Sequence, residues 1–319
     1  MWTIDTSYRP KQNKTFQRLW EKRDMLNRYR PLPAIAMQKI KEALAVEWTY
    51  HSNSIEGNTI TLQETYVILQ DGMTVKGKSL REHFEINNHH KALQYLYRLA
   101  DKKRSVDAAI LLDIHRFMLN SIEDLYAGRF RNAGVRIQGA NFIPPNARKV
   151  PDLIDELILF VQDNPLSLNT IELATVLHHK LVWINPFFDG NGRTARLVMN
   201  LLLLNDGFPP AIILKNDRLK YYDALNRANQ GDYAKLMLLM AQAIERSLNI
   251  YLNALPGSDD DYTEISDIVK EPDVPYSQEY ISLLARQGKI DAYKEGRNWL
   301  TSKKAILNYI HNRERKRLL

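Results

Sequence analysis

Apolar residues recur at three- and four-residue spacing along most of the chain, the period that places them on one face of an α-helix. The pattern predicts a fold of the all-α class for the main body of the chain. It predicts helices over residues 34–48, 80–99, 108–119, 150–161, 171–182, 193–205, 221–228 and 233–252.

One stretch departs from the helical period. Residues 135–145, VRIQGANFIPP, place β-branched and aromatic residues around a Gly-Ala-Asn turn, which predicts a short β-hairpin. A single hairpin cannot form a core sheet, so we expect it on the surface as a flap.

Turn-forming and acidic residues interrupt the pattern at PGSDDD, residues 256–261. We interpret this segment as a linker between a helical domain, residues 1–255, and a small C-terminal module, residues 262–319. In the module, a short apolar helix precedes a predicted hairpin that turns at Glu295 and Gly296. Ser302 is placed to cap a final helix.

This order of elements looks like a winged-helix or excisionase-type helix-turn-helix module. Such folds place a helix in the major groove of DNA and basic side chains on phosphates. The candidate DNA contacts are Lys294, Arg297, Lys303 and Lys304. Protein contacts or dimerisation are the alternative use of such a module, and a homodimer stays open.

Composition narrows the class of protein. The 319 residues are 45% hydrophobic and 25% charged, typical of a soluble globular protein. No run approaches eighteen apolar residues, and the first residues lack the order of a secretory signal, so no membrane role is expected. The absence of cysteine excludes disulfides and thiolate chemistry and fits a cytoplasmic location.

The formal charge of +7 is concentrated at the C-terminal end. From Arg286 to Leu319 there are ten Lys or Arg residues against three Asp or Glu residues. This local excess predicts either an anionic partner for the tail or simply a solvated basic surface.

The most informative stretch is NPFFDGNGRTAR, residues 185–196. A glycine-containing turn, residues 189–192, leads into an apolar helix, so backbone N–H groups and the helix dipole can converge on an anion. Arg193 and Arg196 are three residues apart on the first turn, where two guanidinium groups could hold a polyphosphate. The plain alternative is a Gly/Asn turn between two helices with surface arginines.

The whole stretch resembles the signature of the Fic family, His-Pro-Phe-x-Asp/Glu-Gly-Asn-Gly-Arg-x-x-Arg, and differs from it only at the first position. The flanking segments HHKLVWI and LVMNLLLLNDGFPPAII are similar to the family as well, and the likeness runs from about residue 30 to 250. The resemblance implies an all-α core that binds Mg·ATP. It also implies transfer of AMP to a Ser, Thr or Tyr hydroxyl of a target protein, which could be the chain itself.

The resemblance also assigns roles to single residues. Asp189 would hold Mg²⁺, Arg193 and Arg196 would bind the outer phosphates, and Phe187 would anchor the loop. The α-phosphate would be bound by Gly190, Asn191 and Gly192, and the nucleoside by Tyr221 and Asn229, although packing is an equal alternative for Tyr221. The flap would dock the target's backbone through Val135, Ile137, Gly139, Phe142 and Ile143.

Asn185 occupies the position of the family's catalytic histidine, which takes the proton from the target hydroxyl. A carboxamide has no useful basicity, and loss of a general base costs about 10²–10⁴ in rate. His178 and His179 are expected to be structural. The sequence therefore predicts a scaffold that binds ATP and transfers AMP poorly, whether Asn185 is natural or engineered.

A second motif lies upstream. Ser52 and Glu56 are four residues apart on a predicted helix, about residues 39–57, which Gly57 would end. Taken alone, this is a helix terminus with a solvated glutamate. Beside a Fic core it resembles the family's inhibitory motif, in which Glu56 would pair with Arg196 and block a phosphate position.

Three functions therefore stay open. The first is an autoinhibited protein adenylyltransferase, weakened by Asn185. The second is an enzyme of the same family that removes AMP from targets or transfers another phosphate-linked group. The third is a nucleotide-sensing, DNA-binding regulator with an inactive Fic core.

Overall fold

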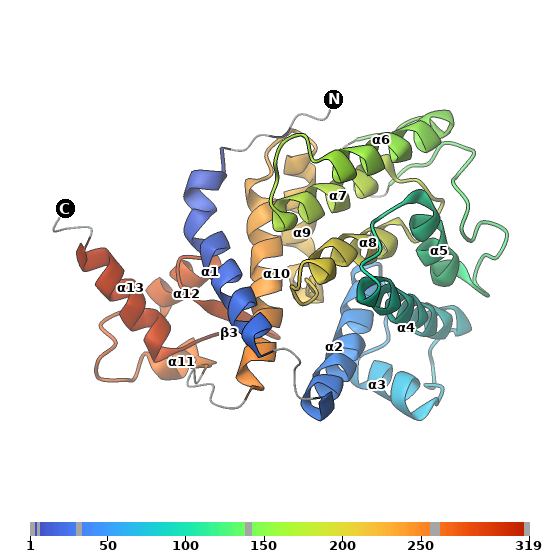
Figure 1. The fold of residues 1–319 in the computed structure, drawn as a ribbon. Coiled ribbons are helices and arrows are strands. Elements are labelled where there is room, and N and C mark those ends of the chain that lie inside the picture. The colour runs from blue at the N-terminus through green and yellow to red at the C-terminus, as the bar shows by residue number, and fades with distance from the viewer. Residues whose placement is uncertain (1–3, 5–6, 30–33, 138–141, 256–261, 316–319) are drawn as a thin grey trace.

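A computed structural model describes residue 4 and residues 7–29, 34–137, 142–255 and 262–315. The fold is predominantly helical, with a small three-stranded sheet near the C-terminus (Figure 1). The helices of the main body are α1 (Arg9–Arg28), α2 (Ala34–Ile55), α3 (Leu62–Asp71), α4 (Leu80–Asp101), α5 (Ala108–Leu119), α6 (Val150–Asp163), α7 (Thr170–Ile184), α8 (Asn191–Asn205), α9 (Arg218–Ala228) and α10 (Ala234–Asn253). The predicted all-α class is confirmed.

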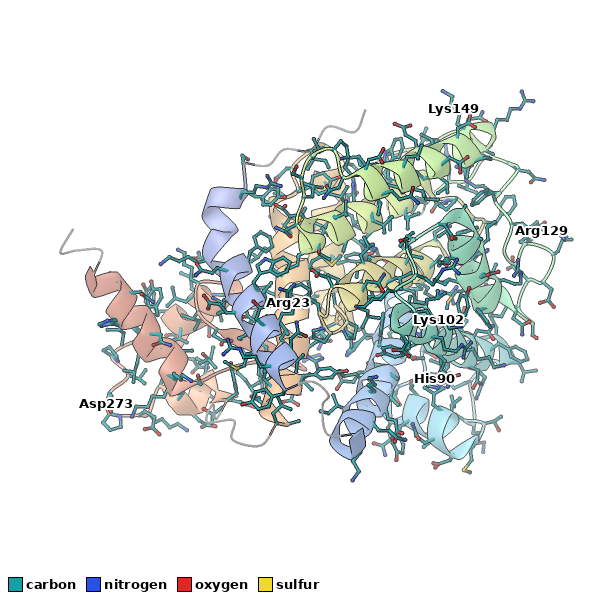
Figure 2. The ribbon with its side chains drawn as sticks, viewed as in Figure 1. Arg23, His90, Lys102, Arg129, Lys149 and Asp273 are labelled. Carbon is teal, nitrogen blue, oxygen red and sulfur yellow. The ribbon has the colours of Figure 1, made fainter. Side chains whose placement is uncertain are left out.

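The centre of the main body is the pair α7 and α8, which pack along each other. Helices α4 and α5 pack against α8, while α10 packs against α7 and α1. Ten of the fifteen residues of α8 are buried, including Arg193, Arg196 and Asn200, as expected for a helix enclosed on several sides. Many other charged side chains lie on the outside, as Arg129, Lys149 and Asp273 do in Figure 2.

Local sequence fixes where several helices begin. Thr61, Ser79 and Asn169 each cap a helix, and a glutamate three residues later bonds back to the cap, which forms a capping box in α3, α4 and α7. In α7, the Glu172 carboxylate also accepts bonds from the Tyr8 hydroxyl and the Arg9 guanidinium. The N-terminal helix is thereby fastened to the start of the central helix pair.

The hairpin predicted over residues 135–145 is corrected for the part that the structure describes. Val135, Ile137, Phe142 and Ile143 are not in strands, and Gly139 lies outside the described residues. No neighbouring strand is available in this helical region, and an isolated hairpin is marginal in water. Residues 135–137 and 142–145, which the structure describes, therefore form loop rather than strand.

The C-terminal module has its own small core, separate from the main one. It contains β1 (Thr263–Glu264), α11 (Ile265–Ile268), α12 (Gln278–Arg286), β2 (Ala292–Glu295), β3 (Asn298–Thr301) and α13 (Lys303–Arg315). The strands form an antiparallel sheet in the order β1-β3-β2. The predicted hairpin is confirmed, with Glu295 opposite Asn298, and the Ser302 hydroxyl accepts the bond from the Ala305 N–H as predicted.

A buried polar network joins the module to α1 and α10, which lie between it and the rest of the main body (Figure 1). The Lys22 ammonium donates to Asp291 at 2.5 Å, to Asn249 at 2.6 Å and to Glu245 at 3.1 Å. Arg18 binds the same Glu245 carboxylate. Because these charges are largely removed from water, each depends on its partners. The linker predicted at residues 256–261 lies outside the described residues.

We expect Asp291→Asn to lower the free energy of unfolding by about 1–3 kcal/mol, measured by urea denaturation. The amide keeps the shape of the carboxylate but leaves the buried Lys22 ammonium without its nearest counter-charge. Asp267→Asn is the matched control, because that carboxylate is exposed and pairs only at the surface with Lys270. Equal unfolding midpoints for the two variants would contradict this account of the docking.

Within the described residues, no helix combines the length and the apolar character that a membrane crossing requires.

Candidate active site

The loop between α7 and α8 is held in a single conformation by short-range contacts. Asn185 ends α7 in the left-handed region, with φ 49°, and Gly190 precedes α8 with φ 74°. The Asn191 side chain accepts from the Phe187 N–H at 2.8 Å and donates to the Phe187 carbonyl at 2.9 Å. Phe187 is fully buried and stacks on His115 with ring centroids 3.6 Å apart. Its predicted place in the core is confirmed.

His115, which the sequence did not single out, braces the same loop from α5. Its Nδ1 accepts a bond from the Gly128 N–H at 3.0 Å, so Nε2 carries the proton and donates to the Asp189 carbonyl at 3.0 Å. Burial lowers the pKa of His115 to about 4. The imidazole is therefore neutral near pH 7, and both ring nitrogens are already engaged.

The first turn of α8 has the features of an anion site. No side chain caps this end, and the first amides of a helix have no partner within the helix. The Arg193 and Arg196 guanidinium groups both lie at this turn, and both residues are only 2% exposed. Backbone amides, the helix dipole and two buried cations thus share one small volume, which favours an anion such as a phosphate.

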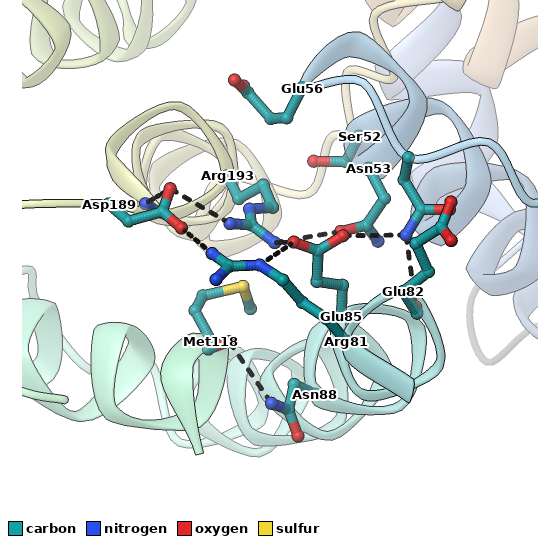
Figure 3. Close-up of polar contacts among 12 residues, drawn as sticks. Ser52, Asn53, Glu56, Arg81, Glu82, Glu85, Asn88, Met118, Asp189 and Arg193 are labelled. Atoms are coloured by element: carbon teal, nitrogen blue, oxygen red, sulfur yellow. Dashed lines mark hydrogen bonds and ion pairs between the residues drawn. The ribbon is translucent and has the colours of Figure 1, made fainter. Parts of the chain in front are cut away.

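Arg193 is surrounded by oxygen atoms from three segments, as Figure 3 shows. Its guanidinium lies 3.3 Å from Glu85 Oε1, 3.4 Å from Asp189 Oδ1 and 3.5 Å from Asn53 Oδ1. These are long contacts. A phosphate oxygen with a full charge would bind the same guanidinium more strongly than contacts of this length do.

Arg196 is held by the end of α2, as the sequence predicts. Its Nη2 donates to Glu56 Oε1 and to the Ser52 carbonyl, both at 2.8 Å, and its Nε donates to the Ser52 hydroxyl at 3.1 Å. The Glu56 carboxylate also lies directly over Gly192. A Cβ atom at position 192 would be 2.3 Å from Glu56 Oε1. A carboxylate therefore occupies the space at the start of α8 where an anion would bind.

We expect Gly192→Ala to lower the free energy of unfolding by about 1–2 kcal/mol. The new methyl would push the Glu56 carboxylate away from Arg196, and losing this charged bond outweighs the better helix propensity of alanine. In a Glu56→Gly background the same change should instead stabilise the protein by about 0.5–1 kcal/mol. Urea denaturation of the parent, the two single variants and the double variant gives the comparison. The same sign in both backgrounds would show that Glu56 does not lie over Gly192.

Asp189 is the carboxylate best placed to share a cation with a bound phosphate. Burial alone would raise its pKa, but Arg193, the Gly190 N–H and Arg81 outweigh burial and hold the pKa below its usual value. No group of three or more metal-binding side chains occurs among the described residues. Mg²⁺ can combine one carboxylate with phosphate and water oxygens, so Asp189 alone could supply the protein ligand for such a cation.

Tyr221 is enclosed beside Arg196, with which its hydroxyl interacts. Tyr221 is 1% exposed, and its hydroxyl lies 2.9 Å from His178 Nε2. Asn229 is partly exposed, and its Oδ1 lies 2.8 Å from His179 Nε2. Burial lowers the pKa of each of these histidines to about 3. Both imidazoles have the surroundings of structural residues, as the sequence analysis expects.

A buried arginine joins the loop after α7 to the region of the predicted flap. Arg131 donates to the carbonyl of Asn185 at 2.7 Å, to that of Pro145 at 2.6 Å and to that of Ala133 at 2.9 Å. Ile143, near the end of the flap region, is 78% exposed. The two ends of the flap region and the position of Asn185 are thus fixed to the same side chain.

The basic residues predicted to contact DNA differ in their surroundings. Lys294 is mostly enclosed and pairs with Asp217 of the main body at 2.8 Å, while Lys303 pairs with two carboxylates that precede α12. Arg297 and Lys304 are exposed. Lys294 and Lys303 therefore already have protein counter-ions.

Comparison with known proteins identifies the region around the site. The profile of the Fic/DOC family matches residues 105–203. The protein adenylyltransferase Fic of Nematostella vectensis is 41% identical over 237 residues, which cover 73% of this chain and 54% of that protein. The chain spans about half the length of the curated relatives it matches.

Two solved structures are similar in fold. Fic-1 of Caenorhabditis elegans, residues 134–508, is 32% identical with a TM-score of 0.69, and the match covers 76% of this chain and 72% of that one. A Fic family protein of Desulfovibrio desulfuricans has a TM-score of 0.61 at 19% identity, covering 95% of this chain and 97% of that one. At that identity the second likeness concerns the fold alone.

Proposed function

The chain belongs to the Fic/DOC family, and on this premise we propose that it is a protein adenylyltransferase that Glu56 restrains and Asn185 impairs. The observation that carries the proposal is the carboxylate at the start of α8. The start of a helix with two buried arginines and no side-chain cap favours a bound anion, and the Glu56 carboxylate occupies that position here. Relatives named protein adenylyltransferase indicate ATP as the substrate.

In the proposed reaction, the oxygen of a target hydroxyl attacks the α-phosphorus of ATP. The bond between that phosphorus and the bridging oxygen breaks, pyrophosphate leaves, and AMP becomes attached to the target. The amides at the start of α8 would bind the α-phosphate, and Arg193 and Arg196 the outer phosphates. Asn191 would act indirectly, because its side chain is used to hold the loop.

Asp189 would hold Mg²⁺ together with the phosphate oxygens, and the cation would offset their negative charge. The carboxylate is suited to this role because its side chain is partly exposed and both oxygens face cationic or N–H groups.

Neither Asn185 nor His115, the two candidates that the structure describes beside the loop, is a suitable acceptor for the proton of the target hydroxyl. The Asn185 side chain lies at the end of α7 and donates a long bond, 3.4 Å, to the Phe187 carbonyl. It cannot accept a proton near pH 7. His115 does not replace it, because burial lowers its pKa to about 4 and both of its nitrogens are bonded. We therefore propose that ATP binding is kept and transfer is slow.

We propose that Glu56 inhibits the enzyme because it competes with ATP for Arg196. While Nη2 donates to Glu56, that guanidinium cannot bind the outer phosphate, and the carboxylate would repel it. Release requires the end of α2 to turn Glu56 outward, and the side chain is 35% exposed, so an outward path exists.

The test is transfer of label from ATP carrying a labelled α-phosphate to the chain itself, compared with Asn185→His. Label that appears with the histidine supports an adenylyltransferase impaired at its base. ATP binding without label in either protein would favour the nucleotide-sensing regulator. Loss of AMP from a modified target would favour the reverse reaction.

A further inference from the structure

One cationic side chain of the site has no role in the scheme above. Arg81, at the second position of α4, reaches across to the loop before α8. Its Nη2 donates to Asp189 Oδ2 at 2.7 Å (Figure 3). Its other nitrogens lie 3.2 Å from Glu123 Oε1 and 3.5 Å from Glu85 Oε1. Arg81 thus bonds the oxygen of Asp189 that Arg193 does not contact.

Both oxygens of the Asp189 carboxylate are therefore occupied. Oδ1 accepts from the Gly190 N–H at 2.6 Å and lies 3.4 Å from Arg193, while Oδ2 accepts from Arg81. A divalent cation needs at least one of these oxygens. Bound at Oδ2, a cation would lie close to the Arg81 guanidinium, and like charges repel over these distances. Movement of one of the two arginines away from Asp189 would relieve this repulsion.

We propose that Arg81 is the counter-ion which a divalent cation displaces from Asp189, and that it thereby sets the metal affinity of the site. The inference rests on the proposed function only in taking Asp189 as the carboxylate that meets the cation. It assigns a positioning role to Arg81, a residue outside the loop and outside α8.

Exposure decides which arginine moves. The Arg81 side chain is 49% exposed, and it can turn toward solvent while keeping its pair with Glu123, which lies on the segment after α5. The Arg193 side chain is 3% exposed and has no comparable path to water. Replacement of Arg81 by a cation at Oδ2 is therefore easier than replacement of Arg193 at Oδ1. The bond from the Gly190 N–H to Oδ1 can persist during this replacement.

Removal of the Arg81 guanidinium should tighten metal binding. It eliminates a partner that competes for Oδ2 and a positive charge close to the cation. Exposed ion pairs of this kind are weak, so we expect Arg81→Ala to lower the dissociation constant for Mn²⁺ about two- to tenfold. Arg81→Lys keeps the charge on a more flexible side chain and should change the constant less.

The experiment is a titration of the full chain, without nucleotide, in which the electron paramagnetic resonance signal of free Mn²⁺ reports binding. Arg104→Ala is the matched control, since it removes the same charge from an exposed arginine that pairs with Asp107, outside this network. Asp189→Asn, made in the Arg81→Ala protein, tests whether the carboxylate is the ligand.

The expected result is tighter binding in Arg81→Ala than in the parent or in Arg104→Ala, and loss of that gain when Asp189 is also changed. Equal constants for the two arginine variants would overturn the proposal, as would binding that survives Asp189→Asn or no binding in Arg81→Ala. None of these outcomes depends on AMP transfer, so a failure here is distinct from a failure of the proposed function.

Discussion

Asn185→His should raise AMP transfer by about 10²–10⁴-fold, the usual contribution of a positioned general base. The backbone at position 185 is fixed by its bonds to Leu181 and Arg131, and its left-handed conformation is one that histidine adopts more readily than most residues. Under the proposed function, the change supplies a side chain that can take the proton.

The measurement is label incorporated from ATP carrying a labelled α-phosphate. Asn185→Gln is the control, because it changes the size of the side chain but adds no basicity. Label from the γ-phosphate should stay at background in every variant, since pyrophosphate leaves. Equal incorporation by the histidine and glutamine variants would show that a base at position 185 does not limit the reaction.

The same variant should show a pH dependence with a defined sign. The introduced imidazole must be neutral to accept the proton, so the transfer rate should rise as pH increases through about 6.5, the ordinary pKa of histidine. His115 would not produce this profile, because its pKa is already lowered to about 4 by burial.

Short stretches of sequence were enough to predict the loop before α8 and the contact between Glu56 and Arg196. The turn at residues 189–192, the pair Arg193 and Arg196, and the four-residue spacing of Ser52 and Glu56 are all readable within short windows. The predicted Glu56–Arg196 pair is present, with Arg196 Nη2 2.8 Å from Glu56 Oε1. Helical periodicity likewise located eight of the helices of the main body.

The residues that complete the site gave no such local signal. His115, Arg131, Arg81 and Glu85 come from different segments and meet the loop only through tertiary packing. A single arginine or histidine on a predicted helix has many ordinary uses. Only its neighbours in space, which the sequence does not state, distinguish a residue that orders the site.

The sequence did not decide two further details, the presence of helix α1 and the surroundings of Tyr221. Helix α1 was not predicted because its buried face includes Thr15 and Lys22, which interrupt the apolar spacing. The burial of these polar side chains is offset by their hydrogen bonds to Gly288 and Asp291. Adjacent tyrosines on α9 differ by about a third of a turn. The structure buries Tyr221, while the hydroxyl of its partly exposed neighbour Tyr222 donates to the Ile55 carbonyl.

Glu56→Gly, made together with Asn185→His, should raise ATP affinity and AMP transfer by about 10–100-fold over Asn185→His alone. The change frees Arg196 Nη2, which keeps its bond to the Ser52 carbonyl and gains room for a phosphate oxygen. It also removes the carboxylate above Gly192, next to which a phosphate would be repelled. A charged bond of about 1.5–3 kcal/mol accounts for a factor of this size.

Calorimetry with ATP and the labelled-transfer assay together distinguish competition for Arg196 from greater mobility of α2 as the cause of activation. Glu42→Gly places the same flexible residue on the exposed side of α2 and should leave both quantities near those of Asn185→His. Glu56→Gln keeps the shape without the charge and should fall between. If Glu42→Gly activated as strongly as Glu56→Gly, mobility of α2 would be the cause, and competition for Arg196 would not.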